Sequence, residues 1–161
     1  MSLPDRKQID LIVYDFDGVM TDNRVTVCED GKESVVVHRG DGLGVSKLRE
    51  LGLQQMILST EQNPVVRARA KKLKLEIIHG VDDKRQTLLK YLKEHDISPD
   101  RVLYIGNDVN DLACMLSVGF RGCPADAEPE ILQICQWVSS KNGGYGVIRE
   151  IFREISNAES V

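Results

Sequence analysis

The chain has 161 residues, of which 42% are hydrophobic and 29% are charged, and its formal net charge is −4. These values are those of a globular protein with room for one well-packed domain, so they exclude a disordered or fibrous chain. The acidic balance argues against a nucleic-acid partner, because contact with a phosphate backbone requires a basic face. We therefore expect one domain over residues 1–161.

The sequence offers little support for membrane insertion or thiolate metal binding. Its apolar runs are well short of the roughly 20 residues that a membrane helix needs. Residues 1–7 also lack the apolar core of a signal peptide. The four cysteines show neither C-x-x-C spacing nor a histidine at zinc-finger distance; they are Cys28, Cys114, Cys123 and Cys135. We expect a cytoplasmic protein with reduced thiols, and neither a membrane partner nor a zinc site.

Apolar runs of strand length alternate with helical patterns along most of the chain. The predicted strands are residues 9–14, 55–58, 76–78, 102–105, 118–120 and 136–138. The predicted helices are residues 42–51, 64–73, 84–95, 111–117, 129–134 and 145–155. Strands that alternate with helices form parallel sheets covered on both faces. The pattern predicts an α/β fold with a doubly wound, Rossmann-like parallel sheet.

One segment interrupts this alternation. Residues 24–28 and 34–38 are valine-rich and flank the polar residues 29–33. Two such runs around a short segment that contains glycine predict a β-hairpin. We expect this hairpin to be inserted as a flap directly after the first strand.

Two carboxylates follow the first predicted strand. Asp15 and Asp17 lie at the strand end, where open α/β sheets bind their ligands, and Gly18 lets the backbone approach a ligand closely. Residues two apart in an extended chain point the same way, so the two carboxylates repel each other unless a hard cation such as Mg²⁺ lies nearby. The alternative is a solvated, Asp-rich turn.

Further polar groups are expected at the same edge of the sheet. Ser59 ends the second long strand, Lys84 opens a helix, and residues 106–111 follow the strand at 102–105. That loop contains Asn107, Asp108, Asn110 and Asp111. A hydroxyl, an ammonium group and a cluster of carboxylates suit phosphoryl transfer, whereas each alone also fits a strand-end hydroxyl, a solvated lysine or a helix cap.

The order of these groups resembles that of the haloacid dehalogenase superfamily, with D-x-D-G, then Ser or Thr, then Lys, then an acidic loop. The resemblance implies that Asp15 attacks phosphorus to give an aspartyl-phosphate, and that Asp17 serves as general acid and base. It implies that Ser59, Lys84 and the backbone at Gly18 hold the phosphoryl group. Mg²⁺ would bind Asp15, the Asp17 main-chain carbonyl and the last loop, with support from Thr21, Asn110 and Asp111.

The last loop departs from the family pattern. Many members have Gly-Asp where this chain has Gly106-Asn107. Either Asn107 is the third Mg²⁺ ligand, with modest affinity, or Asp108 replaces it through a shifted loop.

No segment between the motifs is long enough for a helical cap domain, and this narrows the resemblance. It points to capless phosphatases of eight- and nine-carbon sugar-acid phosphates and to the phosphatase-like domain of acylneuraminate cytidylyltransferases. The supporting segments are residues 15–23, 38–44, 58–63, 69–73, 106–111 and 143–150. The resemblance implies a homotetramer in which residues 25–37 and 142–146 help to close a neighbour's site.

The segment Ser59-Thr60-Glu61 resembles the sialic-acid branch of this group, because octulosonate-type members tend to have Thr-Gly-Arg there. We therefore expect a 9-phosphorylated nonulosonate as substrate, with Glu61 accepting hydrogen bonds from its hydroxyls. The carboxylate of the substrate would pair with Arg39, Arg67 or Lys71.

Three alternative interpretations remain. Octulosonate 8-phosphate is the other substrate that the resemblance allows, and a weakly active or non-catalytic oligomerisation domain linked to a sialate cytidylyltransferase is the other function. A phosphorylation-receiver domain is disfavoured, because it needs an aspartate at the end of the third strand, where the chain has residues 77–80, Ile-Ile-His-Gly.

Overall fold

The computed structural model of the protein describes residues 3–158 and confirms the predicted fold class. A six-stranded parallel sheet has the strand order β5-β4-β1-β6-β7-β8. The strands are β1 (Leu11–Tyr14), β4 (Gln54–Leu58), β5 (Glu76–Ile78), β6 (Val102–Ile105), β7 (Phe120–Cys123) and β8 (Trp137–Val138). The helices are α1 (Arg39–Glu50), α2 (Pro64–Leu73), α3 (Lys84–Glu94), α4 (Val109–Met115), α5 (Pro129–Ile134) and α6 (Val147–Ala158), with 3₁₀ turns η1 (Arg6–Gln8) and η2 (Pro99–Arg101).

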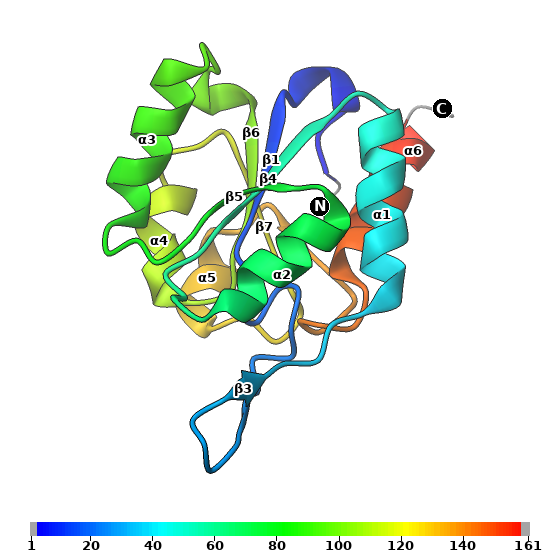
Figure 1. Ribbon diagram of the computed structural model, residues 1–161. Helices are drawn as coiled ribbons and strands as arrows, with labels where there is room; N and C mark the ends of the chain where they lie inside the picture. The colour runs from blue at the N-terminus through cyan, green and yellow to red at the C-terminus, as the bar shows by residue number, and fades with distance from the viewer. Residues whose placement is uncertain (1–2, 159–161) are drawn as a thin grey trace.

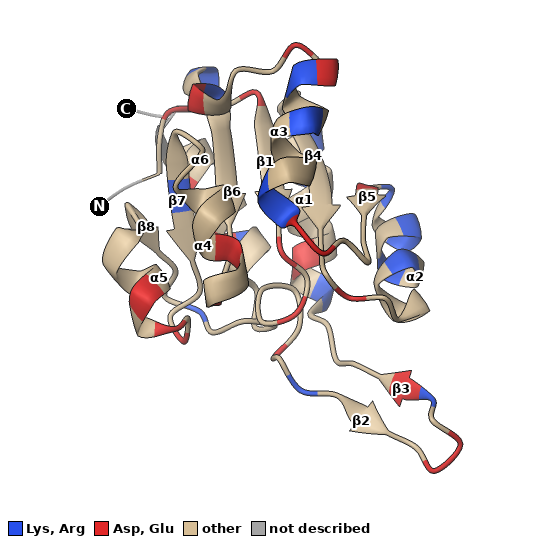
Figure 2. Ribbon diagram, turned by 90° about the vertical axis from the view of Figure 1, so that its left-hand side faces the viewer, with Lys and Arg blue, Asp and Glu red and all other residues tan. Residues whose placement is uncertain are grey.

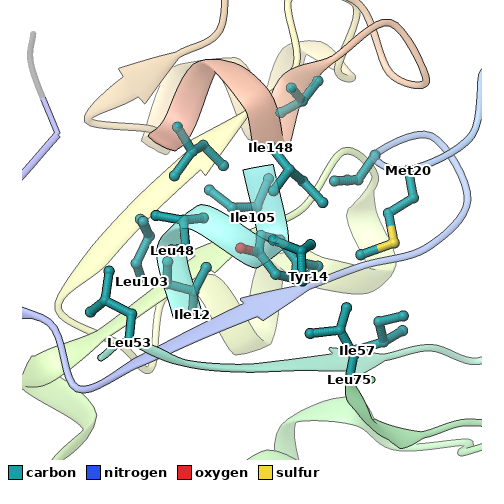
Figure 3. Close-up of a cluster of buried hydrophobic side chains, with 14 of the residues drawn as sticks. Ile12, Tyr14, Met20, Leu48, Leu53, Ile57, Leu75, Leu103, Ile105 and Ile148 are labelled. Atoms are coloured by element: carbon teal, nitrogen blue, oxygen red, sulfur yellow. The ribbon is translucent and has the colours of Figure 1, made fainter. Parts of the chain in front are cut away.

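The helices form a layer on each face of the sheet (Figure 1). Helices α1, α2 and α6 cover one face, and α3, α4 and α5 cover the other. Successive side chains of a strand point to opposite faces, so in β1 Ile12 and Tyr14 enter the first core and Leu11 and Val13 enter the second. Figure 3 shows the first core, where Leu48 and Ile148 approach β1. Burial on both faces explains why β1 and β6 are uninterrupted apolar runs.

The chain changes direction between β1 and β6. From β1 it winds outward through β4 and β5, and it then returns to β6 on the other side of β1 before continuing to β7 and β8. Tyr14 pairs with Ile105, and the main-chain N–H of Asp15 donates to the carbonyl of Ile105 at 2.9 Å. The segments after β1 and β6 therefore begin side by side, at the switch point where doubly wound sheets bind ligands.

The predicted hairpin is present but has a shorter ladder than expected. Only β2 (Thr26–Val27) and β3 (Glu33–Ser34) pair, and the hairpin projects away from the helices and sheet (Figures 1 and 2). Its base is closed by a bridge between Thr21 and Val37. An isolated two-stranded ribbon has no third strand or helix to support a longer ladder. Three of its valines are correspondingly exposed, at 50% for Val25, 63% for Val27 and 70% for Val36.

Several predicted boundaries differ from those of the structure. The helix predicted at residues 42–51 is α1, which begins at Arg39 because His38 caps it, and two further differences also have a physical reason. The strand predicted at residues 118–120 is β7, which begins at Phe120, because Val118 packs into the core below α4 and Gly119 passes against the backbone of Asp100. The helix predicted at residues 111–117 is α4, which begins at Val109 because Asp108 caps it. Among the described residues, no helix is long and apolar enough to cross a membrane.

Candidate active site

The predicted catalytic groups converge at the carboxyl ends of β1, β4 and β6. They line a hollow of about 100 Å³, formed by Asp15, Asp17, Asn23, Ser59, Thr60, Glu61, Asn107, Asp108 and Asn110. The sheet brings these residues together from three strand ends because all its strands are parallel. Larger hollows of about 430 and 420 Å³ lie elsewhere on the described surface, but none of these carboxylates lines them.

Lys84 links the loop after β1, residues 15–22 (the nucleophile loop), to the loop after β6, residues 106–111 (the last acidic loop). Its Nζ lies 2.7 Å from Oδ1 of Asp15 and 2.7 Å from Oδ1 of Asp111, and its side chain is 2% exposed. Burial tends to lower the pKa of Lys84, but the two carboxylates outweigh this effect, so its pKa is raised and the ammonium stays charged. A buried cation is thus fixed beside the predicted nucleophile.

Asp111 organises the loop rather than facing the hollow. Its Oδ1 also accepts a 2.8 Å hydrogen bond from the hydroxyl of Tyr104, and its Oδ2 accepts one of 3.0 Å from the main-chain N–H of Asn107. The carboxylate is fully buried. Asp111 therefore holds Lys84 and the main chain at Asn107 in place. The sequence predicted a supporting role for Asp111 without naming these partners.

The environment of Asp15 favours its neutral form in the metal-free protein. Burial, followed by the charge of Asp111, raises the pKa of Asp15 to about 7, although Lys84 acts in the opposite direction. A cation bound at the other carboxylate oxygen would favour the ionised form.

Asp17 is half-buried and held by Thr21. The hydroxyl of Thr21 donates to Oδ1 of Asp17 at 3.1 Å and accepts a 3.2 Å hydrogen bond from the N–H of Gly18. Burial raises the pKa of Asp17, against the lowering effect of the Thr21 hydroxyl. A carboxyl group with a raised pKa is suited to donate and accept a proton near neutral pH.

Asn107 completes a set of oxygens that fits a small cation. One end of its carboxamide lies 2.9 Å from the carbonyl oxygen of Asp17 and 3.1 Å from Oδ2 of Asp15. With nitrogen at that end, the carboxamide donates to both oxygens. With the carboxamide oxygen at that end, it lies close to the carbonyl oxygen of Asp17 and to Oδ2 of Asp15. These three oxygens repel one another unless a cation binds between them. Adjacent oxygens around octahedral Mg²⁺, each about 2.1 Å from the metal, are about 2.9 Å apart, so the observed spacing suits that ion.

Asp108 is placed differently. Its Oδ1 accepts a 2.6 Å hydrogen bond from the N–H of Val109, and together with Asp111 it forms a capping box at the start of α4. Of the two ligands left open by the sequence, the geometry favours Asn107. Within residues 3–158, no group of three or more His, Cys, Asp or Glu side chains is arranged to hold a metal, so this set depends on a main-chain carbonyl and a carboxamide.

The loop after β4 supplies a hydroxyl and a carboxylate. Ser59 is buried, and its Oγ accepts a 3.1 Å hydrogen bond from the N–H of Glu61, which leaves the hydroxyl hydrogen free to donate. Oε1 of Glu61 accepts from the N–H of Asn63, which caps α2. Both Ser59 and Glu61 line the hollow.

A second groove of about 330 Å³ adjoins the first hollow and shares Asp17, Asn23 and Glu61 with it. Its remaining lining comes from the base of the hairpin and the start of α2: Arg24, Val25, Glu33, Val35, Asn63 and Val65. Arg24 was not among the predicted substrate ligands. Its position one residue after Asn23, beside the motif, is the signal that could have identified it.

The three cations predicted to bind the substrate line neither the hollow nor the groove. Arg39 begins α1 and Lys71 lies in the last turn of α2, both exposed. Arg67 donates to Nε2 of His79, whose Nδ1 lies 3.1 Å from the carbonyl oxygen of Glu61. Among the residues that line the groove, Arg24 is the one cation.

The fold and the site together define an α/β enzyme with a carboxylate and lysine centre at the switch point of its sheet. Residues 47–151 match the family model of the haloacid dehalogenase-like hydrolases. The chain belongs to this family, as its motifs predicted.

Solved structures and curated relatives agree with this assignment. A putative HAD family hydrolase from Streptomyces avermitilis is 49% identical, with a TM-score of 0.94 over 98% of this chain and 91% of the other. The 3-deoxy-D-manno-octulosonate 8-phosphate phosphatase from Moraxella catarrhalis, in complex with magnesium, phosphate and KDO, is 30% identical, with a TM-score of 0.90 over 94% and 88%. The N-acylneuraminate cytidylyltransferase A of Danio rerio is 28% identical over 90% of this chain, which spans about a third (34%) of that protein. Both branches of the predicted resemblance are thus represented.

Proposed function

We propose that the protein is a Mg²⁺-dependent phosphomonoesterase that hydrolyses a sugar-acid phosphate through an aspartyl-phosphate on Asp15. One observation carries the proposal. Oδ1 of Asp15 is fixed by Lys84 at 2.7 Å, while its Oδ2 lies 3.1 Å from the carboxamide end of Asn107, which is itself 2.9 Å from the carbonyl oxygen of Asp17. The carboxylate is therefore oriented between a permanent cation and an oxygen set that suits a second cation.

Mg²⁺ would be held by Asp15, the carbonyl of Asp17 and Asn107. When bound, it neutralises charge between the anionic nucleophile and the anionic phosphate. The magnesium and phosphate in the Moraxella relative support this assignment.

The residues of this chain account for the two steps. In the first, Asp15 forms a bond to phosphorus as the bond to the substrate oxygen breaks, and protonated Asp17 gives that oxygen a proton. In the second, Asp17 takes a proton from water, which attacks phosphorus and releases Asp15. Ser59 and Lys84 supply donors to the phosphoryl oxygens near Asp15, and the lack of a side chain at Gly18 leaves room for the carboxamide of Asn107. Thr21 orients Asp17 throughout.

The groove beside the hollow is proposed to hold the body of the substrate. Arg24 would pair with the sugar-acid carboxylate, and Glu33 and Glu61 would accept hydrogen bonds from hydroxyl groups. The Moraxella relative favours octulosonate 8-phosphate. The Glu61 pattern favours a 9-phosphorylated nonulosonate, and the acylneuraminate in the name of the Danio rerio relative is a sugar acid of that class.

Phosphate release from both sugar acids, with and without Mg²⁺, tests the proposal. Neutral sugar phosphates of similar size serve as controls for the carboxylate. We expect Mg²⁺-dependent release from an acidic sugar phosphate that is abolished in Asp15→Asn. Release that continues without divalent cations contradicts the mechanism, and a protein that hydrolyses none of these substrates supports a non-catalytic oligomerisation domain.

The exposed hairpin supports a proposed homotetramer. Val25, Val27 and Val36 are exposed and belong to a hairpin that projects from the rest of the protein, which favours contact with another copy of the chain. Light scattering tests this assembly, and a stable monomer at micromolar concentration contradicts it.

A further inference from the structure

Residues 139–146, which connect β8 to α6 and contain Gly143 and Gly144 (the C-terminal glycine segment), pack against the nucleophile loop of the same chain. The N–H of Gly144 donates to the carbonyl of Val19 at 3.0 Å. A Cβ on Gly143 would overlap the carbonyl oxygen of Gly18 and lie 2.6 Å from its carbonyl carbon. A Cβ on Gly144 would lie 2.5 Å from the main-chain nitrogen of Asp22. Neither position has room for a side chain, because backbone lies against backbone.

Gly18 is confined from two sides. Opposite Gly143, a Cβ on Gly18 would lie 2.6 Å from Cγ of Asn107, the proposed Mg²⁺ ligand. Gly18 follows the carbonyl of Asp17 directly, so a shift of Gly18 moves that carbonyl. The position of one proposed metal ligand therefore depends on the contact between Gly18 and Gly143.

The glycine segment is itself anchored to the rest of the fold. The N–H of Gly143 donates to Oδ1 of Asp126 at 2.9 Å, and Glu150 of α6 accepts from the N–H of Ser140 at 3.0 Å and from its hydroxyl at 2.6 Å. The hydroxyl of Ser139 also donates to Glu150. These contacts fix the segment that connects β8 to α6 in the position where it contacts the nucleophile loop.

We infer that Gly143 and Gly144 are positioning residues that set the geometry of residues 15–22 and, through the Asp17 carbonyl, the affinity for Mg²⁺. The inference rests on the proposed function for its metal-binding part. It acts within one chain, and it is therefore separate from any contact that residues 142–146 make with a neighbouring subunit. Neither glycine lines the hollow, so neither touches the substrate.

Gly143→Ala isolates this contact. The φ angle of Gly143 lies outside the left-handed region, so alanine adds the methyl group without backbone strain. The matched control is Gly42→Ala in α1, where the new Cβ meets only the end of the Leu73 side chain at 3.3 Å. Three quantities are measured: amide hydrogen exchange of residues 15–22 without metal, Mg²⁺ affinity by calorimetry without substrate, and kcat and KM.

We expect Gly143→Ala to speed exchange in residues 15–22, to weaken Mg²⁺ binding about tenfold and to lower kcat up to about a hundredfold, with a much smaller change in KM, since small displacements of catalytic groups cost this much. Gly42→Ala should match the wild type. If Gly143→Ala fails to fold, Asp126→Ala removes the exposed acceptor that anchors the N–H of Gly143, and it should change the same quantities in the same direction by a few-fold.

The outcomes separate the two claims. Wild-type exchange in residues 15–22 and wild-type Mg²⁺ affinity in a folded Gly143→Ala protein overturn the inference. Faster exchange in that variant, combined with a wild-type protein that binds no Mg²⁺, overturns the proposed function and leaves the positioning of the loop supported.

Discussion

Replacing Lys84 by methionine removes the cation that links Asp15 to Asp111. The ammonium lies 2.7 Å from both carboxylates, and all three groups are buried. Methionine fills a similar volume but leaves the buried carboxylate of Asp111, and that of Asp15 when it is ionised, without a counter-charge. Breaking a buried ion pair costs about 3–5 kcal/mol, and we expect a loss of unfolding free energy of this order in the metal-free protein.

The same substitution should lower turnover by a larger factor than its effect on substrate binding. Loss of one positioned donor to a developing charge costs roughly a hundred- to a thousandfold in kcat. Without Lys84 the pKa of Asp15 rises further, so less of the carboxylate is ionised at neutral pH. At a pH below the pKa, each unit by which the pKa of Asp15 rises lowers the ionised fraction of Asp15, and with it kcat, about tenfold.

Urea unfolding and steady-state kinetics measure the two effects. Lys90→Met is the matched control, because Lys90 lies on the same helix, is exposed and is 3.9 Å from Glu94. The double variant Lys84→Met with Asp111→Asn removes one stranded charge, so it should regain part of the stability and none of the activity. Wild-type stability and turnover in Lys84→Met would refute the assignment of Lys84.

Three further predictions concern pH, the metal and the substrate. The pKa of Asp15 is about 7 in the folded protein and 3.8 as the unperturbed value, so its contribution to stability is full below about pH 4 and is lost as the pH rises toward about 7. Urea unfolding without metal should therefore show a stability loss over this range that is absent in Asp15→Asn, and equal pH profiles for the two proteins would contradict the raised pKa. Asn107→Asp should tighten Mg²⁺ binding about tenfold or more, because it adds a negative charge beside the cation; calorimetry measures this, with Asn157→Asp, exposed on α6 and outside the hollow, as control, and unchanged affinity would argue against Asn107 as a ligand. Arg24→Gln should raise KM for an acidic sugar phosphate about tenfold with little change in kcat; the exposed Arg153→Gln on α6 is the control, and an equal effect on a neutral sugar phosphate would remove the carboxylate from the explanation.

The sequence located the centre of the site because local patterns determine it. Asp15, Ser59 and Asn107 each follow an apolar strand, and parallel strands end at one edge of the sheet. Lys84 was found because it opens a helix on that edge. Where periodicity gave the strand ends, the site followed without knowledge of any contact.

Local patterns were insufficient where a side chain has two competing partners. Asp108 and Asn107 are both metal-type residues, and only the structure shows that Asp108 is used as a helix cap. The spacing of Asp108 and Asp111 is that of a capping box, which was the available signal. The start of the strand predicted at residues 118–120 was wrong for a similar reason. An apolar valine fits a strand or a core position outside a strand, and Val118 packs in the core after α4.

Contacts between distant segments could not be predicted from the sequence. Arg67 and Lys71 were candidates because they are cations near a motif, but their direction depends on how α2 packs, and Arg67 faces His79. Arg24 lines the groove together with Asn63 and Val65 from the start of α2, which are about 40 residues away in the sequence. The contact of Gly143 with Gly18 likewise joins two segments that are far apart in the sequence.

The central claim is that phosphorus becomes bonded to Asp15. The protein is mixed with an acidic sugar phosphate and Mg²⁺, quenched during turnover and treated with borohydride, which reduces an acyl phosphate to an alcohol. Mass spectrometry of the peptide that contains residue 15 should then show homoserine in place of Asp15, and only when both substrate and Mg²⁺ are present. Reduction at another residue, or an unmodified Asp15 in samples quenched during rapid turnover, would contradict the claim.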